Sequence, residues 1–328
     1  MHRYIIRRLL LMIPVMIGVS FLVFFILDLA PGDIVDVIAP EDATIEDKER
    51  MREEMGLNRN VVVRYIDYMS DLVRGDLGTS HLTGRDVFKT FMEKVPNTLY
   101  LGTLSIVFSV ALSLPLGIFA AKRRGTVADN ISMVLALIGL SMPNFWLGLL
   151  LIIVFSLKLG WLPSGGTEGI TSVILPMVTI GTGQMAILTR TTRSSMLEVI
   201  RQDYLRTARA KGVTEKRVIN HHALRNALIP IVTIIGTQVS TVLGGAVLTE
   251  TVFSWPGIGR LIIDSLNSRD TIQVTGSLIM TTMFISVIML MVDLLYGVID
   301  PRIKAQYSSK KGDDSSGKSK TSTSGASK

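Results

Sequence analysis

Residues 203–230 read DYLRTARAKGVTEKRVINHHALRNALIP, a basic and helix-prone segment between two apolar stretches. Asp203 is a suitable N-cap and Gly212 a suitable C-cap, so the pattern predicts a short helix that ends at the glycine. A second helix is expected to begin at Thr214 and to lead into the next apolar stretch. Because so charged a segment does not lie in hydrocarbon, the stretches on both sides of it decide the fold.

The chain contains six apolar blocks, each near or above the roughly 17 to 25 residues that a membrane-spanning helix needs. They are Leu9–Ala30, Thr98–Ala121, Ile131–Leu157, Val173–Thr189, Ala227–Thr249 and Thr275–Ile299. The mean hydropathy is +0.43, and only 19% of the 328 residues are charged. We therefore predict an all-α polytopic membrane protein with six transmembrane helices.

Charge assigns the two sides of the membrane. Segments 1–8, 122–130, 190–226 and 300–328 share one side and together carry a formal charge of +15, whereas the segments of the opposite side carry −6. Basic loops stay in the cytoplasm, so both termini are expected there, in a multi-pass protein of the plasma or inner membrane. The net charge of +7 therefore reports topology and requires no nucleic-acid partner.

This topology divides the chain into four parts. Residues 1–30 are expected to form a cytoplasmic stub with the first transmembrane helix, and residues 31–93 an extracytoplasmic loop. Residues 94–302 form the core with five transmembrane helices and the cytoplasmic loop 190–226. The tail, residues 303–328, is rich in Ser, Lys and Gly without apolar periodicity, so we expect it to be disordered.

Two short helices are expected in the extracytoplasmic loop. The first begins near Thr44 and ends at Gly56. The second is indicated by the apolar residues Val63, Ile66, Met69 and Val73, which recur at helical spacing. We expect these helices to cap the outer end of the bundle.

Isolated motifs of enzymes and metal proteins lack the required context. Gly312–Ser319 matches the phosphate-binding pattern G-x-x-x-x-G-K-[ST], but no strand precedes it and no helix follows. His221 and His222 are adjacent and so do not share a helix face as paired metal ligands do. The chain has no cysteine. We expect no catalytic residue, no metal site and no cofactor bound by this chain.

Two other kinds of membrane protein remain as alternatives. A secondary carrier or a stand-alone channel would transport without partner subunits, but coupled carriers place ionisable groups near the membrane midplane. Asp28 and Asp293, the only acidic residues inside the apolar blocks, lie near block ends instead. An intramembrane enzyme would need a nucleophile or metal set at membrane depth, and the sequence indicates none.

Several stretches together resemble the permeases of ABC importers, in the branch that takes up dipeptides, oligopeptides and nickel. They are RRLL at Arg7–Leu10, APGD at Ala30–Asp33, RGDLGTS at Arg74–Ser80, VPNTL at Val95–Leu99, GLSMPNFWLG at Gly139–Gly148, LGWLPSGG at Leu159–Gly166, RTARAKG at Arg206–Gly212 and ETVFSWPGIGRL at Glu250–Leu261. At the position of the family's cytoplasmic Glu-Ala-Ala motif the chain has Arg206-Thr207-Ala208, so the glutamate and the first alanine are replaced, whereas the second alanine and the motif's glycine are kept as Ala208 and Gly212. The likeness extends over roughly residues 1–304 and is to the first, B-type, of two permease subunits with a MetI-like fold.

The resemblance implies a complex with a second homologous permease, two ATPase subunits that bind ATP and Mg, and an extracytoplasmic substrate-binding protein. It implies that the short cytoplasmic helix is the coupling helix that docks on one ATPase. The residues expected in that contact are Asp203, Tyr204, Leu205, Ala208, Arg209, Ala210, Gly212 and Val213. The expected function is import of di- or oligopeptides, with nickel or another small solute as the alternative cargo.

Polar residues inside the apolar blocks are candidates for the translocation pathway. They are Thr182, Thr189, Gln238, Thr241 and Gly245. Each of them is equally well explained by hydrogen bonds between helices and close packing of small residues. The sequence alone leaves these two interpretations open.

Overall fold

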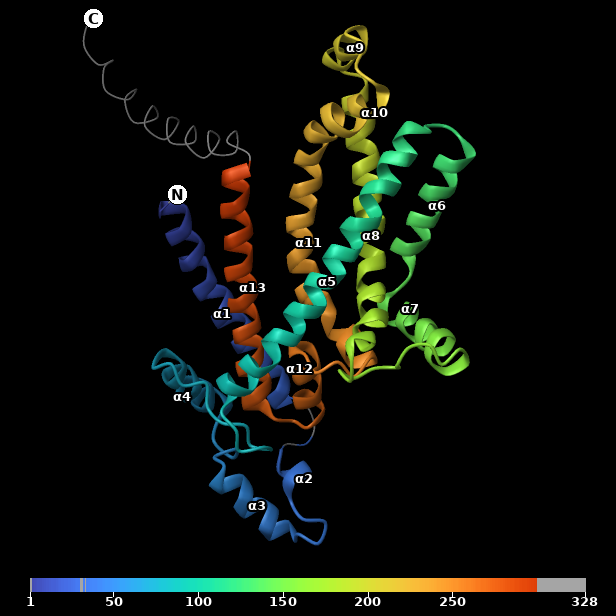
Figure 1. Ribbon diagram of the computed structural model, residues 1–328. Coiled ribbons are helices and arrows are strands. Elements are labelled where there is room, and N and C mark those ends of the chain that lie inside the picture. Colours follow the sequence, from blue (N-terminus) through green and yellow to red (C-terminus); the bar gives the residue numbers. More distant parts are fainter. Residues whose placement is uncertain (1, 30–31, 33, 300–328) are drawn as a thin grey trace, which may run out of the picture.

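The structure is a computed structural model that describes residues 2–29, 32 and 34–299 (Figure 1). The described chain is helical, with one isolated antiparallel bridge between Thr79 and Asp86 and no strand. The predicted tail, residues 303–328, lies outside the described residues, and so does the phosphate-loop match at Gly312–Ser319.

The helices follow one another in a simple order. They are α1 (His2–Leu29), α2 (Val35–Ile38), α3 (Ile45–Glu54), α4 (Val61–Val73), α5 (Val87–Lys122), α6 (Val127–Ser141), α7 (Asn144–Leu151), η1 (Ile152–Lys158), η2 (Ile170–Val173), α8 (Ile174–Ile200), α9 (Asp203–Ala210), α10 (Glu215–Arg217), η3 (Val218–Ala223), α11 (Leu224–Val252), α12 (Ile258–Asn267) and α13 (Thr271–Ile299). The short pieces α10 and η3 continue directly into α11, so the helix expected from Thr214 runs on into the fifth apolar block.

Five helices of the described chain are long and apolar enough to cross a membrane. These spans are Leu10–Leu29, Val87–Lys122, Ile170–Ile200, Glu215–Val242 and Thr271–Leu294. α6 and the segment Asn144–Lys158 form a bent pair, which gives a sixth candidate span when the two are taken together (Figure 1). The prediction of an all-α polytopic membrane fold is confirmed.

The third apolar block is not the single straight helix that its composition predicts. Its two halves, α6 and the segment Asn144–Lys158, are bent by 101° relative to each other. The break falls at Met142, whose backbone is extended with ψ 125°, and at Pro143. A proline disfavours the helical conformation of the residue before it, which explains the position of the break.

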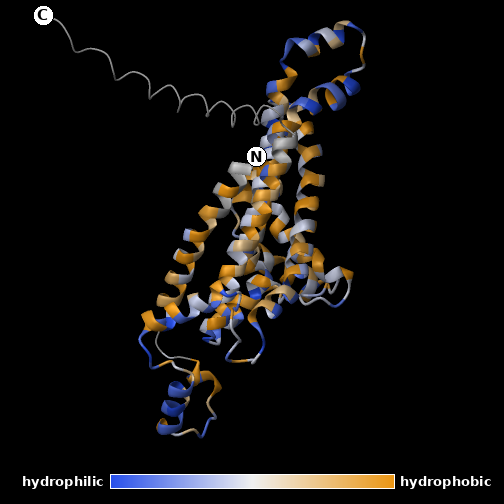
Figure 2. Ribbon diagram, turned by 90° about the vertical axis from the view of Figure 1, so that its left-hand side faces the viewer, coloured by the Kyte–Doolittle hydropathy of each residue, from blue (hydrophilic) through white to orange (hydrophobic). Residues whose placement is uncertain are grey.

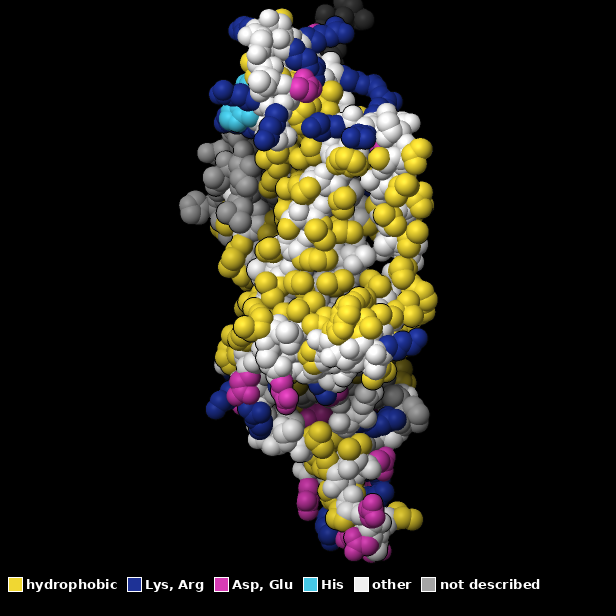
Figure 3. Space-filling model, turned by 45° about the vertical axis from the view of Figure 1, so that its right-hand side comes forward, with side chains coloured by type: hydrophobic (Ala, Val, Ile, Leu, Met, Phe, Trp, Pro, Cys, Tyr) yellow, Lys and Arg dark blue, Asp and Glu magenta, His cyan; other side chains and the backbone are white. Residues whose placement is uncertain are grey.

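The distribution of polarity matches a protein that crosses a membrane. Apolar residues cover the middle of the long helices, and hydrophilic residues lie at both ends (Figure 2). Lys and Arg gather at the end that carries α9, whereas Asp and Glu gather at the opposite end (Figure 3). The start of α1 and the end of α13 lie toward the same end as α9 (Figure 1). We call this the basic end and the other the acidic end.

α8 lies at the centre of the bundle and touches α5 at two glycines. A side chain on Gly117 of α5 would place its Cβ 2.5 Å from the Cβ of Thr192. A side chain on Gly181 of α8 would meet the ring of Phe108 at 2.5 Å. The Ser109 hydroxyl donates to the carbonyl of Gly181 over 2.8 Å. Small residues thus let the backbones of α5 and α8 approach closely, as in other membrane helix pairs.

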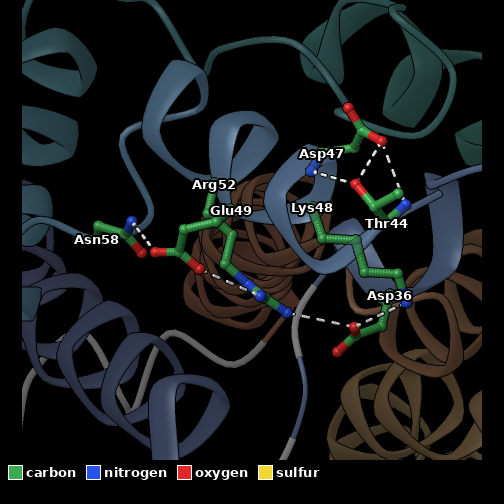
Figure 4. Close-up of polar contacts among 7 residues, drawn as sticks. All are labelled: Asp36, Thr44, Asp47, Lys48, Glu49, Arg52 and Asn58. Carbon is green, nitrogen blue, oxygen red and sulfur yellow. Dashed lines mark hydrogen bonds and ion pairs between the residues drawn. The ribbon is translucent and has the colours of Figure 1, made fainter.

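At the acidic end, polar contacts hold α3 (Figure 4). α3 begins at a capping box formed by Thr44 and Asp47, close to where the sequence places its start. It has no buried residue, and Lys48 and Arg52 pair with Asp36 of α2 at 3.8 and 3.2 Å. α3 is therefore attached to α2 by charge rather than by an apolar core.

α4 forms where the sequence predicts it. Tyr68 is buried against Phe24 of α1, whereas Val63, Ile66 and Val73 are exposed. Of the four residues whose spacing predicts the helix, Met69 is the one that packs against α1. Spacing thus identifies the helix, but it leaves open which face packs on the protein.

Candidate functional site

α9 projects from the basic end as a separate short helix that ends at Gly212 (Figure 1). Gly212 has φ +79°, and its N–H donates to the carbonyl of Arg209 over 2.9 Å. The N–H of Val213 donates to the carbonyl of Ala208 over 3.2 Å. These two bonds form a Schellman motif, which favours glycine because a side chain is strained at this φ.

The start of α9 differs by one residue from the sequence expectation. Gln202 occupies the N-cap position, with no side-chain cap, and Asp203 is the first helical residue. Asp203 still lies in the first turn, where a negative charge favours the helix dipole. The boundary therefore shifts without changing the helix.

The apolar stripe of α9 packs onto its own chain. Leu205 is fully buried in a cluster with Met196 of α8 and Val218, and Ala208 and Val213 pack against the same cluster. These three of the expected ATPase-docking residues therefore hold α9 against the bundle. The cluster fixes the position of α9 relative to α8 and to the start of α11.

The other expected docking residues lie toward solvent. Asp203, Tyr204, Ala210 and Gly212 are exposed, and Arg209 is half-buried. Arg209 donates two hydrogen bonds of 3.0 Å to the carboxylate of Glu215, which raises the pKa of its guanidinium. We call the exposed residues Asp203, Tyr204, Ala210 and Gly212 the α9 outer surface.

Three of the candidate pathway residues lie inside helix contacts. The Gln238 side chain of α11 is buried and donates to the carbonyl of Gln184 on α8 over 3.2 Å. Thr189 of α8 is buried close to Gly117. Thr182 is half-buried, and its methyl group lies against Gly139 of α6. The structure thus places these three in helix packing.

Thr241 is exposed, and it belongs to a longer row. Thr233, Thr237 and Thr241 recur every four residues on α11 and are all exposed. Their hydroxyls donate to carbonyls of their own helix, over 2.8 Å for Thr237 and 3.3 Å for Thr241. We call these three residues the threonine row. Sequence reasoning missed Thr233 and Thr237, although their four-residue period was a usable signal. Gly245 lies on the same helix.

The threonine row lies away from a buried side of α11. Val242 of α11 is buried in a cluster that also contains Leu101 of α5 and Ile180 of α8. At about 100° per residue, Thr241, Thr237 and Thr233 lie about 100°, 140° and 180° around the helix from Val242. The threonine row therefore belongs to a side of α11 that does not take part in this cluster.

Toward the basic end, a cavity of about 520 Å³ lies between α6 and α8. It is lined by Met133, Ile187, Arg190, Thr191, Arg193 and Ser194. Arg193 forms two hydrogen bonds of 2.6 and 2.7 Å with the buried carboxylate of Asp129. This pair joins the start of α6 to α8 just where the chain leaves the apolar region.

At the acidic end, Glu250 is a fully buried carboxylate that sequence reasoning did not single out. It accepts hydrogen bonds from the Thr98 hydroxyl and from the N–H groups of Gly259 and Arg260, at 2.7, 2.7 and 3.2 Å. Any side chain on Gly257 would collide with this carboxylate. The motif ETVFSWPGIGRL is therefore explained locally, since Glu250 caps α12 and the glycines make room for it.

Comparison with known proteins agrees with this architecture. Residues 113–305 match the family described as "Binding-protein-dependent transport system inner membrane component". Residues 1–102 match the corresponding N-terminal family of membrane components. The fold resembles that of a chain in the inward-facing methionine ABC transporter MetNI, with a TM-score of 0.53 and 19% identity over 65% of this chain and 97% of that chain.

Curated relatives match over nearly the whole chain. The oligopeptide transport system permease protein AppB of Bacillus subtilis (strain 168) is 41% identical, with coverage of 93% of this chain and 100% of the relative. The dipeptide transport system permease protein DppB of Escherichia coli (strain K12) is 40% identical, with coverage of 93% and 99%. Both are named as transport system permease proteins. With its bundle of apolar helices and its separate short helix α9, the chain belongs to the family of inner membrane components of binding-protein-dependent transport systems.

Proposed function

We propose that this chain is one permease subunit of an ATP-driven importer and forms half of the translocation pathway for di- or oligopeptides. The observation that carries the proposal is α9, a helix outside the bundle that is fixed at a defined position by Leu205 and ends at a Schellman glycine. A helix that only linked α8 to α11 would not need both an apolar anchor and an exposed outer surface.

We assign the α9 outer surface to ATPase docking. Asp203, Tyr204, Ala210 and Gly212 are exposed together, and α9 contacts the ends of both α8 and α11 through one apolar cluster. A movement of α9 would therefore be transmitted to α8 and α11. The ATPases, with their ATP and Mg, are separate subunits in this proposal, and both termini lie with α9 in the cytoplasm.

We assign the threonine row to the pathway. A peptide backbone presents amide donors and acceptors, and threonine hydroxyls offer weak, uncharged partners that do not hold it tightly. Facing a similar row on a second, homologous permease, the row would line half of a polar pathway. In this assignment Gln238, Thr189 and Thr182 hold neighbouring helices together. Gly245 stays a pathway candidate.

The substrate class rests on the relatives. Those named above are an oligopeptide and a dipeptide permease, which favours peptides over nickel or another small solute. Delivery would occur at the acidic end, where residues 31–93 and the segment after Glu250 would receive the binding protein. In this proposal residues 94–302 are the permease core, and residues 303–328 are dispensable.

The experiment is purification of the tagged chain in mild detergent, followed by uptake in vesicles. Two ATPases and a second permease are expected to co-purify, and uptake of a labelled dipeptide is expected to require both ATP and the binding protein. Transport by the chain alone would favour a stand-alone channel or carrier and overturn the proposal. Uptake of nickel with no uptake of peptide would overturn the substrate class only.

A further inference from the structure

α4 presents four large apolar side chains away from the rest of the chain. Val62, Val63, Ile66 and Val73 are 48, 41, 59 and 84% exposed. We call them the outer row of α4. We propose that α4 is an interfacial helix whose outer row lies in the lipid of the outer leaflet of the membrane.

The depth of α4 is set by its contacts with α1. The Tyr65 hydroxyl donates to the carbonyl of Ile17 over 3.2 Å and lies 3.0 Å from the Ser20 hydroxyl. Both α1 residues belong to the membrane span Leu10–Leu29. Ile17 is about 18 Å along the helix from Leu29, at 1.5 Å per residue. Even with the length of a tyrosine side chain, α4 lies beside the span rather than beyond it.

The side chains of α4 fall into three sectors. The first packs on α1 and α13, where Tyr68 joins a cluster with Phe24 and Ile279. At about 100° per residue, Asp67 and Asp71 lie in a second, charged sector, and the outer row forms the third. Asp67 pairs with Arg59 at 2.8 Å, so the charged side is built for an aqueous surrounding.

This arrangement fits a helix at a membrane surface. Such helices place one apolar face roughly 5–10 Å into the boundary between headgroups and acyl chains and keep a charged face in water. Figure 1 shows α4 beside α1, between the helix bundle and the α2–α3 segment. At the depth of Tyr65 and Ser20, lipid is the surrounding medium of the span. We therefore assign lipid, and not a protein partner, as the surrounding of the outer row.

The absence of cysteine from the sequence makes a direct test possible. Ile66→Cys in the outer row and Asp71→Cys in the charged sector each carry one environment-sensitive nitrobenzoxadiazole probe. The two positions lie on the same helix and are both exposed, so they form a matched pair. The complete complex is placed in vesicles of phosphatidylethanolamine and phosphatidylglycerol. Quenching by nitroxide on the lipid acyl chains is compared with quenching by iodide in the water.

At Ile66→Cys we expect blue-shifted emission and several-fold stronger quenching by the lipid nitroxide than at Asp71→Cys, with iodide showing the reverse order. Val62→Cys repeats the measurement on the same row, should the Ile66 variant fail to assemble. Equal iodide quenching at both sectors would place α4 in water and overturn the proposal. Shielding of the outer row from both quenchers would assign the row to a protein partner and overturn it as well.

Discussion

The carboxylate of Glu250 on α11 accepts a hydrogen bond from the hydroxyl of Thr98 on α5, and the same hydroxyl accepts one from the N–H of Ile258 on α12. The distances are 2.7 and 2.9 Å. One buried acid and one threonine thus join three helices at the acidic end. Burial in this position raises the pKa of the Glu250 carboxyl, which its three hydrogen bonds partly offset.

Glu250→Ala is expected to destabilise the protein strongly, because it leaves the Thr98 hydroxyl and two N–H groups of α12 without an acceptor. Each unsatisfied buried group costs roughly 1–3 kcal/mol. The measurement is thermal unfolding of the purified protein in detergent. Asp264→Ala is the matched control, since it removes an exposed acid that pairs with Arg260 on the same helix. An alanine variant as stable as the parent would show that Glu250 does not hold α12.

Gly212→Val is expected to leave the chain inserted but to weaken ATPase docking and abolish substrate-stimulated ATP turnover. The φ of +79° makes any side chain cost roughly 1 kcal/mol or more. Gly75→Val controls for strain, because Gly75 has φ +87° and also lies in open space, but between α4 and α5, away from α9. Co-purification of the ATPases and their turnover are compared. Normal turnover in the Gly212 variant, or equal loss in both variants, would contradict the role of α9 in docking.

Thr241→Trp is expected to block peptide uptake while the complex still assembles, because a bulky ring would fill part of the pathway that the threonine row is proposed to line. Val107→Trp is the control, since Val107 is 57% exposed but lies on α5, outside the threonine row. Uptake and ATP turnover are measured together in vesicles. If the tryptophan at Thr241 transports as fast as the control, the threonine row does not line the pathway.

Asp36→Ala is expected to loosen α3 by roughly 0.2–1 kcal/mol, the usual contribution of exposed ion pairs. Hydrogen exchange of residues 45–54 reports this as a few-fold faster rate, and added salt should have a similar effect on the parent protein. Arg50→Ala is the control, because Arg50 pairs only within α3, with Asp47. Unchanged exchange in the Asp36 variant would mean that other contacts hold the helix.

Stability at the acidic end is expected to fall as the pH drops below about 6.5, because His81 is held neutral. Burial lowers the pKa of His81, the charge of Arg64 lowers it further, and the charge of Asp270 opposes both. The unfolded chain then takes up a proton that the folded chain resists, so stability is lost as pH falls toward the folded pKa. In thermal unfolding, the melting temperature of His81→Gln should depend less steeply on pH than that of the parent protein. An unchanged pH dependence in this variant would contradict the role of His81.

Much of the fold could be predicted from the sequence, but not the direction of every face. The length of the apolar blocks predicts the candidate membrane spans, since hydrocarbon thickness fixes helix length. The charge of the loops predicts on which side of the membrane each loop lies. They do not reveal the bend at Pro143, because a bent pair has the same composition as a straight span. The spacing of Val63 and Ile66 likewise predicts a helix. It does not reveal whether these residues pack on the protein, because packed and exposed apolar faces have the same spacing.

The candidate site was predicted with similar limits. Gly212 was recognisable from the sequence because the left-handed conformation after a helix end strongly favours glycine. The burial of Leu205 depends on the ends of α8 and α11, and no local pattern contains that information. Glu250 was missed because an acid next to an apolar block usually marks the end of the block. Its partner Thr98 lies 152 residues away, and only the folded chain brings the two together.

The close contact of α5 with α8 has a mechanical consequence. With Gly117 against Thr192 and Gly181 against Phe108, neither helix can slide past the other without a steric clash. We therefore expect α5 and α8 to move as one rigid unit, to which α9 is attached at the basic end. In the proposed importer, a displacement of α9 by an ATPase would tilt this unit as a whole. Its opposite end would then change position without bending of either helix.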